Sequence, residues 1–407
     1  MAIRHLYVHV PFCPTVCPFC SFEVTERRGG LVAGYLDRIA VEAEALAAQY
    51  PHRLETIYIG GGTPSHLRDA ELARLFGTIR GAFGDAAVGA AAEVTMEVHP
   101  ATASRRRLER WIELGVNRFS VGVQSFDDAV LDRLGRGHSA AVGRRALELA
   151  LEVASDAGST ADGLPNVRVA MDVMTAIEAQ DPAADLAAAA ASGVDHISAY
   201  TLTIEPGTPF AAREVEVDPE AEGRALDAAS EVLGAAGLVR YEVSNHARRG
   251  HESRHNLAYW DNAWWSSLGP GASSHLPPSD ADLGVDCDLV AIRRTSAALG
   301  PWLDGHPGEV DPRDTEGYVI DGVLAGLRRV TGVDLVELGS KVGLGRDEVE
   351  SRWGPAVEEV DVKRWVTVER SGGALSLVPT SAGMLVLDQV AAAFLSPLSG
   401  SRPGWGG

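Results

Sequence analysis

The sequence predicts an α/β fold, a partial (β/α)6 barrel of the TIM type followed by a small α+β domain. Two observations lead to this prediction. Six short runs of β-branched residues alternate with longer Ala-, Leu-, Glu- and Arg-rich stretches that carry apolar residues at helical spacing. Near the C-terminus this alternation gives way to several helices and one hairpin. A repeated strand–helix unit implies a parallel sheet with right-handed crossovers, closed or nearly closed into a barrel.

The predicted strands and helices follow in a regular order. The strands are HLYVHV (5–10), ETIYIGG (55–61), EVTMEVH (93–99), RFSVGVQS (118–125), VRVAMDVM (167–174) and HISAYTLT (196–203). The clearest helices between and after them cover residues 35–50, 69–83, 104–114 and 221–237. In such barrels ligands bind beyond the C-terminal ends of the strands, so we expect the functional residues there.

We expect four segments along the chain. They are the barrel with its extension (1–276), a Pro-, Gly- and Asp-rich linker (277–312), a winged-helix-like domain (313–395) and a disordered tail (396–407). The third segment reads as three helices, a hairpin around Gly372 and Gly373, and a last amphipathic helix. Its acidity argues against DNA binding, and covering the barrel mouth is the simpler role.

Composition limits the classes of partner. The net charge of -20, from 36 basic and 56 acidic side chains, disfavours nucleic acid, which needs a basic patch against its phosphates. Neither a secretory signal nor a membrane-spanning run is visible, so we expect a cytoplasmic protein without a membrane partner. In that reducing compartment, clustered cysteines bind metal or act in catalysis more often than they form disulfides.

Three of the four cysteines follow the first strand directly. Cys13, Cys17 and Cys20 form C-x3-C-x2-C, whereas Cys287 lies far away in a polar loop. A structural zinc site would want a fourth ligand with its own local spacing, and none follows closely. Three soft thiolates suit an iron–sulfur cluster that keeps its fourth iron open. The alternative, three small buried hydrophobes, would not require this spacing.

The motif, with Phe19 before its last cysteine, resembles the signature of the radical SAM superfamily. Its members bind S-adenosylmethionine on a [4Fe-4S] cluster and cleave it reductively to a 5'-deoxyadenosyl radical, so the resemblance implies both cofactors and a flavodoxin- or ferredoxin-type electron donor. It places Phe19 near the adenine. It also places YIGGGTPS, with Gly60, Gly61, Gly62 and Thr63, near the amino group of S-adenosylmethionine. Glycines let backbone approach a ligand closely and present N–H groups.

Further motifs resemble one subgroup, that of coproporphyrinogen III dehydrogenase (HemN) and the haem chaperone HemW. They are YVHVPFC, GGGTPS, GVNRFSVGVQSF, LGRGH, HISAYTLTIEPGT, YEVSN and HNLAYW. Members can hold two S-adenosylmethionine molecules. The resemblance implies that Tyr7 lies near the cluster, and that cofactor contacts come from Glu97, Gln124, Arg136 and Asp172. Ion pairs or strand-end caps are the alternative for the last four. Glu205 is a candidate general base, or simply a carboxylate at the start of a loop.

Aromatic residues cluster around the HNLAYW motif. Tyr259, Trp260, Trp264 and Trp265 stand beside His255 and Asn256 in the sequence, which suits a flat substrate or haem. Packing between the barrel and the appended domain explains the same residues equally well.

The sequence departs from the subgroup in segments that we expect to lie near the substrate. Ser21 replaces an aspartate after the third cysteine, TAIEAQD (175–181) replaces GLPGQT, His99 stands where the subgroup has EANP or EVDP, and SLGPGA (267–272) replaces GIGAGA. These changes, and the lack of a cobalamin-binding pattern before the barrel, favour a class C-like radical SAM methyltransferase. Its substrate would be a heteroaromatic or peptide natural product such as a thiopeptide thiazole, methylated with two S-adenosylmethionine molecules. The alternatives are a HemW-type haem chaperone and a HemN-like cyclopropane-forming enzyme.

Overall fold

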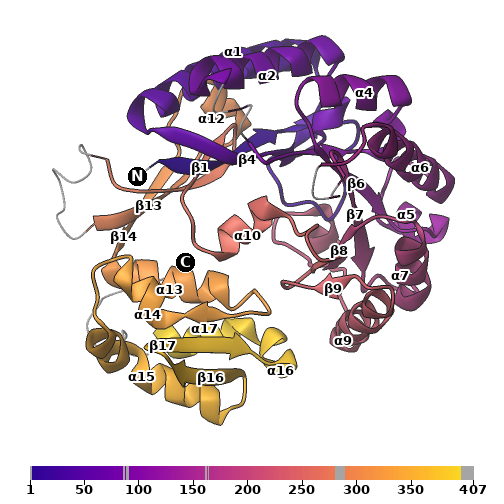
Figure 1. Cartoon of the computed structure of the whole chain (residues 1–407). Helices are drawn as coiled ribbons and strands as arrows, with labels where there is room; N and C mark the ends of the chain where they lie inside the picture. The colour runs from indigo at the N-terminus through magenta and orange to yellow at the C-terminus, as the bar shows by residue number, and fades with distance from the viewer. Residues whose placement is uncertain are drawn as a thin grey trace.

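The core of the protein is a curved sheet wrapped by helices (Figure 1). The computed structural model describes residues 2–85, 88, 91–160, 163, 165–279 and 289–395. Six neighbouring strands run parallel: β1 (Ile3–Val10), β4 (His52–Gly61), β5 (Glu93–Val98), β6 (Arg118–Gln124), β7 (Arg168–Thr175) and β8 (His196–Thr201). These strands confirm the predicted α/β fold and its six parallel strands.

Helices cover the outer face of the sheet because each presents an apolar stripe to it. Leu6 and Val8 of β1 belong to the same buried cluster as Tyr35 and Ile39 of the helix that follows. The helices around the sheet are α1 (Gly29–Gln49), α2 (Asp69–Phe83), α4 (Arg105–Glu113), α5 (Asp128–Arg133), α6 (Ala140–Asp156), α7 (Pro182–Ala191), α8 (Pro209–Ala212), α9 (Pro219–Ala228) and α12 (Leu299–Leu303).

The sheet continues beyond the six parallel strands at both edges. β10 (Asn245–Ala247) pairs antiparallel with β8, and β9 (Val239–Arg240) pairs antiparallel with β10. Next to β1 lies β11 (Trp265–Leu268), parallel to it, followed by antiparallel β12 (Ser273–Leu276), β13 (Leu289–Thr295) and β14 (Glu309–Asp314). β13 and most of β14 lie within the predicted linker (277–312), which is therefore partly built into the sheet. The domain boundaries themselves stay a prediction.

The inside of the barrel is polar. In TIM barrels this space is filled mainly by Val, Ile and Leu. Here β1 points His5 and Tyr7 inward, where they meet side chains of α10 (Arg254–Trp260) and β4. Figure 1 shows α10 lying between the strands and the C-terminal domain. The residues on the inner face are thus available for binding as well as for packing.

The C-terminal domain has its own apolar core, which includes Trp353 and Phe394. Its elements are α13 (Thr315–Gly326), β15 (Val333–Asp334), α14 (Leu335–Ser340), α15 (Arg346–Val362), β16 (Val366–Ser371), β17 (Ala374–Pro379), α16 (Ser381–Met384) and α17 (Leu387–Leu395). β17 lies between β15 and β16 in a three-stranded sheet, which agrees with the predicted winged-helix-like order. The predicted tail (396–407) and Cys287 lie outside the described residues.

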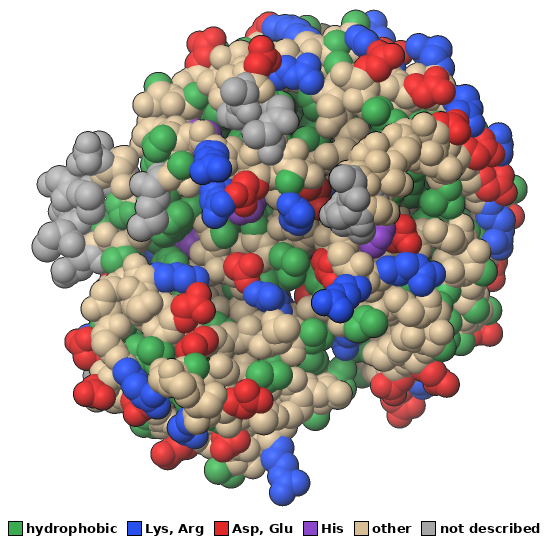
Figure 2. Space-filling view, in the orientation of Figure 1, with side chains coloured by type: hydrophobic (Ala, Val, Ile, Leu, Met, Phe, Trp, Pro, Cys, Tyr) green, Lys and Arg blue, Asp and Glu red, His purple; other side chains and the backbone are tan. Residues whose placement is uncertain are grey.

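Acidic and basic side chains are intermixed over the face shown in Figure 2. Several form exposed ion pairs, such as Arg105 with Glu152 and Asp156. None of the helices that the structure describes combines the length and the apolar character required to cross a bilayer.

Candidate functional site

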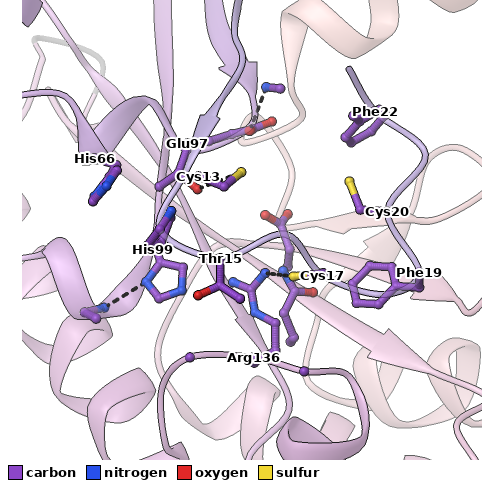
Figure 3. A pocket seen from close by; sticks show the side chains of 18 of the residues that line it. Cys13, Thr15, Cys17, Phe19, Cys20, Phe22, His66, Glu97, His99 and Arg136 are labelled. Carbon is purple, nitrogen blue, oxygen red and sulfur yellow. Dashed lines mark hydrogen bonds between the residues drawn. The ribbon is translucent and has the colours of Figure 1, made fainter. Parts of the chain in front are cut away.

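A cavity of about 590 Å³ lies at the C-terminal ends of the parallel strands (Figure 3). Its lining includes most of the predicted site residues: Cys13, Cys17, Phe19, Cys20, Gly61, Thr63, Glu97, Gln124, Arg136 and Asp172. The volume is within the range of small-molecule sites in proteins. The topology thus brings residues from five strand ends and the cysteine loop to one place.

The cysteine loop leaves the sheet at β2 (Phe12–Cys13), which pairs with β3 (Thr25–Glu26) and so closes the loop at its base. Within it the Cys20 amide donates to the Cys17 carbonyl at 3.1 Å. All three thiols line the cavity and none forms a disulfide. Within the described residues, no three His, Cys, Asp or Glu side chains are grouped so that they could hold one metal ion.

This donor set fits an iron–sulfur cluster. Three thiols on one loop face a cavity that has room for a cluster and leaves other positions for a ligand. Burial raises the pKa of Cys13 to about 11, and burial also raises the pKa of Cys20. Without iron these two thiols are therefore protonated at neutral pH. Binding of a cluster must release their protons.

The glycines at and just after the end of β4 lie where a larger side chain would clash with its neighbours. A Cβ on Gly60 would lie 2.6 Å from Glu97 Oε1, and a Cβ on Gly62 would lie 2.8 Å from the Val10 carbonyl oxygen. The expectation that this segment presents N–H groups to a ligand is wrong for three residues. The amides of Gly61, Gly62 and Thr63 donate to Glu97, to Val10 and to Phe12, respectively.

Two carboxylates form an acidic wall of the cavity. Glu97 accepts from the Tyr58 hydroxyl at 3.0 Å and from the Gly61 amide at 3.0 Å. Burial, with a further contribution from Asp172, raises the pKa of Glu97 to about 7. Asp172 accepts from the Ser120 hydroxyl at 3.2 Å, and burial raises its pKa as well. The wall favours a cationic or hydrogen-bond-donating group of a ligand.

Arg136 and Gln124 lie near the cysteines. Arg136 donates from Nη1 to Cys17 Sγ at 3.4 Å and from Nη2 to the Gly122 carbonyl at 3.1 Å. Gln124 has a φ of 70°, an unusual conformation for a residue other than glycine. Such backbone strain occurs often at binding sites, because the surrounding structure has to hold it.

Of the remaining predicted residues, Phe19 lines the cavity, whereas Tyr7 and Glu205 do not. Phe19 lines it and packs against Phe210. Tyr7 does not line it: its hydroxyl is 3.0 Å from His9 Nδ1, and its ring lies beside that of Tyr58. Glu205 is exposed and outside the lining, so the structure gives no support to its proposed role as a base.

Several cavity residues escaped the sequence analysis. Tyr58 and Met174 alternate with the predicted residues Gly60 on β4 and Asp172 on β7, so strand alternation could have found them. Tyr200 comes from β8, where no site residue was predicted. His66, Thr15 and Thr102 come from loops and a short turn, where the sequence carries no periodic signal. His99 had been noted only as a departure and lies in the lining.

The HNLAYW motif forms α10 and is mostly inside the molecule. His255 is buried, with Nδ1 2.7 Å from the Thr56 hydroxyl and Nε2 2.8 Å from the Tyr259 hydroxyl. The nearby tryptophans do not share one flat face, since Trp264 packs on Tyr318 of α13 and Trp265 on Tyr259. This agrees with packing between the barrel and the C-terminal domain.

Comparisons with known proteins match one superfamily and show two relatives that are similar over most or nearly all of the chain. The sequence pattern of the radical SAM superfamily matches residues 7–171. The heme chaperone HemW of Synechocystis sp. is 31% identical over 357 residues, 82% of this chain and 80% of that protein. The heme chaperone HemW of Bacillus subtilis is 29% identical over 409 residues, 97% of this chain and all of that protein (100%).

The fold also has a close counterpart among solved structures. Coproporphyrinogen III oxidase (HemN) from Escherichia coli, a radical SAM enzyme, matches with a TM-score of 0.75 over 97% of this chain and 90% of that one. The two sequences are 18% identical, so this similarity concerns the fold alone.

The relatives contradict the predicted reaction. The prediction of a class C-like methyltransferase is wrong, because proteins similar over most of the chain are named haem chaperones. The predicted heteroaromatic or peptide natural-product substrate is wrong for the same reason. Local departures such as TAIEAQD reshape loops, but they do not identify a reaction when the rest of the chain matches another group.

Proposed function

Since the chain belongs to the HemN/HemW-like subgroup of the radical SAM superfamily, we propose that it is a haem chaperone of the HemW type. Such a protein would bind haem as cargo and pass it to an acceptor protein. The observation that carries the proposal is the similarity to the HemW protein of Bacillus subtilis, which includes the C-terminal domain as well as the barrel. The predicted superfamily and subgroup are thereby confirmed, and the superfamily implies a [4Fe-4S] cluster and S-adenosylmethionine.

In this proposal Cys13, Cys17 and Cys20 hold the cluster. An open iron of such a cluster supplies a binding position for the amine and carboxylate of S-adenosylmethionine. The acidic wall would then face the positively charged groups of the cofactor, and Phe19 would contact its adenine ring. The cluster and one such molecule would share the cavity of about 590 Å³. Binding of a second S-adenosylmethionine stays a prediction, and the chaperone function does not require it.

The structure limits the role that His255 could have in coordinating haem iron. Both ring nitrogens of His255 already have partners inside the barrel, so this histidine is not free to coordinate haem iron in the arrangement described. Coordination by His255 would require α10 to move and would leave the hydroxyls of Thr56 and Tyr259 without that partner. We therefore propose that haem binds through other groups unless α10 rearranges.

The test is a haem titration of the full-length, cluster-loaded protein under anaerobic conditions, followed by mixing with an apo-haemoprotein. We expect a saturable shift of the Soret band and then its transfer to the acceptor. Unfolded protein at equal concentration is the control for non-specific haem adsorption. A missing Soret shift, or accumulation of S-adenosylhomocysteine on incubation with S-adenosylmethionine, would contradict the proposal.

A further inference from the structure

The part of the cavity wall that includes Thr15 and Arg136 differs in its side chains from the acidic wall. It carries two histidines, His66 and His99, which come from the turns after β4 and β5. Figure 3 shows the ring of His99 beside Thr15 and the guanidinium of Arg136. The cavity lining therefore combines two carboxylates, Glu97 and Asp172, with the nitrogen donors of His66, His99 and Arg136.

His99 is fixed as a hydrogen-bond donor. The Ala101 amide donates to its Nδ1 at 3.2 Å, so the proton of the neutral ring is on Nε2. The ring is neutral because burial, and then the charge of Arg136, lower the pKa of His99 to about 3. No hydrogen bond to Nε2 is formed by any residue within the described part of the chain. The donor therefore remains for a ligand.

The surroundings hold this ring in place. His99 is only 9% exposed and packs edge to face on His138, with ring centroids 5.0 Å apart. His138 is anchored in turn by donating to the Val123 carbonyl at 3.1 Å. The backbone of His99 donates to the Ser65 hydroxyl and accepts from Thr102. A donor that is this well fixed loses little entropy when a ligand binds.

Arg136 adds a positive charge to the same wall. Two of its nitrogens are engaged with Cys17 and the Gly122 carbonyl, while its buried Nε has no hydrogen-bond partner among the described residues. A fixed neutral donor beside a cation is an arrangement that suits an anionic oxygen. The carboxylates of Glu97 and Asp172 would repel an anion placed beside them, which favours a position next to His99 and Arg136.

We propose that His99 Nε2 and Arg136 form a carboxylate-binding subsite of the cavity, in which His99 is a specificity-determining contact. Two carboxylates are candidates, that of S-adenosylmethionine and a propionate of haem. The second source rests on the proposed chaperone function, and the first does not. In either case the subsite exists because His99 stands where an aspartate would offer no donor at neutral pH.

The test compares three proteins after cluster reconstitution: wild type, His99→Leu and His99→Gln. Leucine removes the donor without adding charge, whereas glutamine can place an N–H near the position of Nε2. Iron and sulfide content and thermal unfolding show that each variant is folded and loaded. Equilibrium binding is measured for S-adenosylmethionine, for haem, and for haem dimethyl ester, in which both propionates are blocked.

We expect His99→Leu to lose about tenfold in affinity for one carboxylate ligand, and His99→Gln to stay within about threefold of wild type. A loss confined to S-adenosylmethionine assigns the subsite to that cofactor. A loss confined to haem, with the ester bound weakly and equally by all three proteins, assigns it to a propionate. Unchanged affinities for both ligands in His99→Leu would overturn the subsite.

A wild-type protein that binds no haem would refute the chaperone function. The test of His99 as a contact of S-adenosylmethionine would not be affected by that result. If His99→Leu does not fold, wild-type protein and His99→Gln still decide the haem arm. Equal affinity of wild type for haem and its dimethyl ester excludes a propionate. His99→Gln then has to retain its affinity for S-adenosylmethionine, and a loss beyond tenfold would refute a role of the Nε2 donor.

Discussion

Arg136 donates a hydrogen bond to the thiol of Cys17 across 119 residues of sequence, with Nη1 and Sγ 3.4 Å apart. The arginine lies just after α5 and the cysteine lies in the loop after β2, so the contact joins two ends of parallel strands. A guanidinium stays charged at any physiological pH. If Cys17 binds the cluster as proposed, Arg136 would act electrostatically on the cluster as well as on a bound ligand.

We expect Arg136→Gln to make the reduction potential of the cluster more negative, on the order of 50 mV. The added electron increases the negative charge of the cluster, and the substitution removes the nearby positive charge that favours it. An anaerobic redox titration monitored by electron paramagnetic resonance measures the change. The control is Arg133→Gln, an exposed residue of α5, which should leave the potential unchanged. Equal shifts in both variants would contradict the local effect.

Gly62→Ala should damage the cysteine loop. The added Cβ would meet the Val10 carbonyl oxygen at 2.8 Å and Cys13 Sγ at 3.0 Å, so either the strand end or the first cluster ligand has to move. We expect a loss of about 2 kcal/mol in unfolding free energy and a lower iron content after reconstitution. Urea denaturation and iron analysis measure these quantities.

The matched control is Gly77→Ala within α2, where the new Cβ has no neighbour within 4 Å. That substitution should stabilise the protein by roughly 0.5–1 kcal/mol, because alanine suits a helix interior better than glycine. Full iron content in Gly62→Ala would show that the loop tolerates the methyl group.

The sequence was sufficient to predict the six parallel strands and, with the family resemblance, ten of the residues that line the cavity. Because parallel strands end at the same edge, Cys13, Glu97 and Asp172 had to come together once their strands were recognised. How deeply a side chain lies inside the barrel could not be predicted in this way. The family resemblance implies that Tyr7 lies near the cluster, but the structure shows that its hydroxyl is bonded to His9 and that it lies outside the cavity lining.

The pairing of strands that are far apart in the sequence was the second feature that local sequence patterns could not predict. β11 pairs with β1 although more than 250 residues separate Tyr7 from Ser267, and the segment carries no mark of its partner. The same holds for β13 and β14, whose residues read locally as a linker. The HNLAYW motif illustrates the converse, since a sequence suited to a haem ligand forms a buried, hydrogen-bonded helix.

Glu97 should make the stability of the iron-free protein depend on pH. Its pKa is about 7 in the folded state and has its ordinary value of 4.5 when unfolded. Between these two values the folded state binds more protons, so the contribution of Glu97 is favourable at low pH and is lost as the pH rises to 7. Glu97→Gln removes this dependence, because glutamine can accept from Gly61 and donate to the Tyr58 hydroxyl without a charge.

We expect Glu97→Gln to be more stable than wild type by ~1–2 kcal/mol at pH 8, and to show no such gain at pH 5. Thermal unfolding at the two pH values measures the difference. Glu44→Gln, on the exposed face of α1, is the control and should follow wild type at both. A constant difference at both pH values would show that the effect is not caused by ionisation.

His255→Ala should destabilise the protein without removing a haem ligand. The substitution empties a buried site and leaves the hydroxyls of Thr56 and Tyr259 without that partner, which costs about 2–4 kcal/mol. His306→Ala, at an exposed position, should stay within about 0.5 kcal/mol of wild type.

Urea denaturation gives the stability, and a haem titration below the onset of unfolding gives the Soret shift of folded protein. We expect the shift to be kept, because both nitrogens of His255 are engaged inside the barrel. A variant with wild-type stability and no Soret shift would instead identify His255 as the iron ligand and require that α10 opens to receive haem.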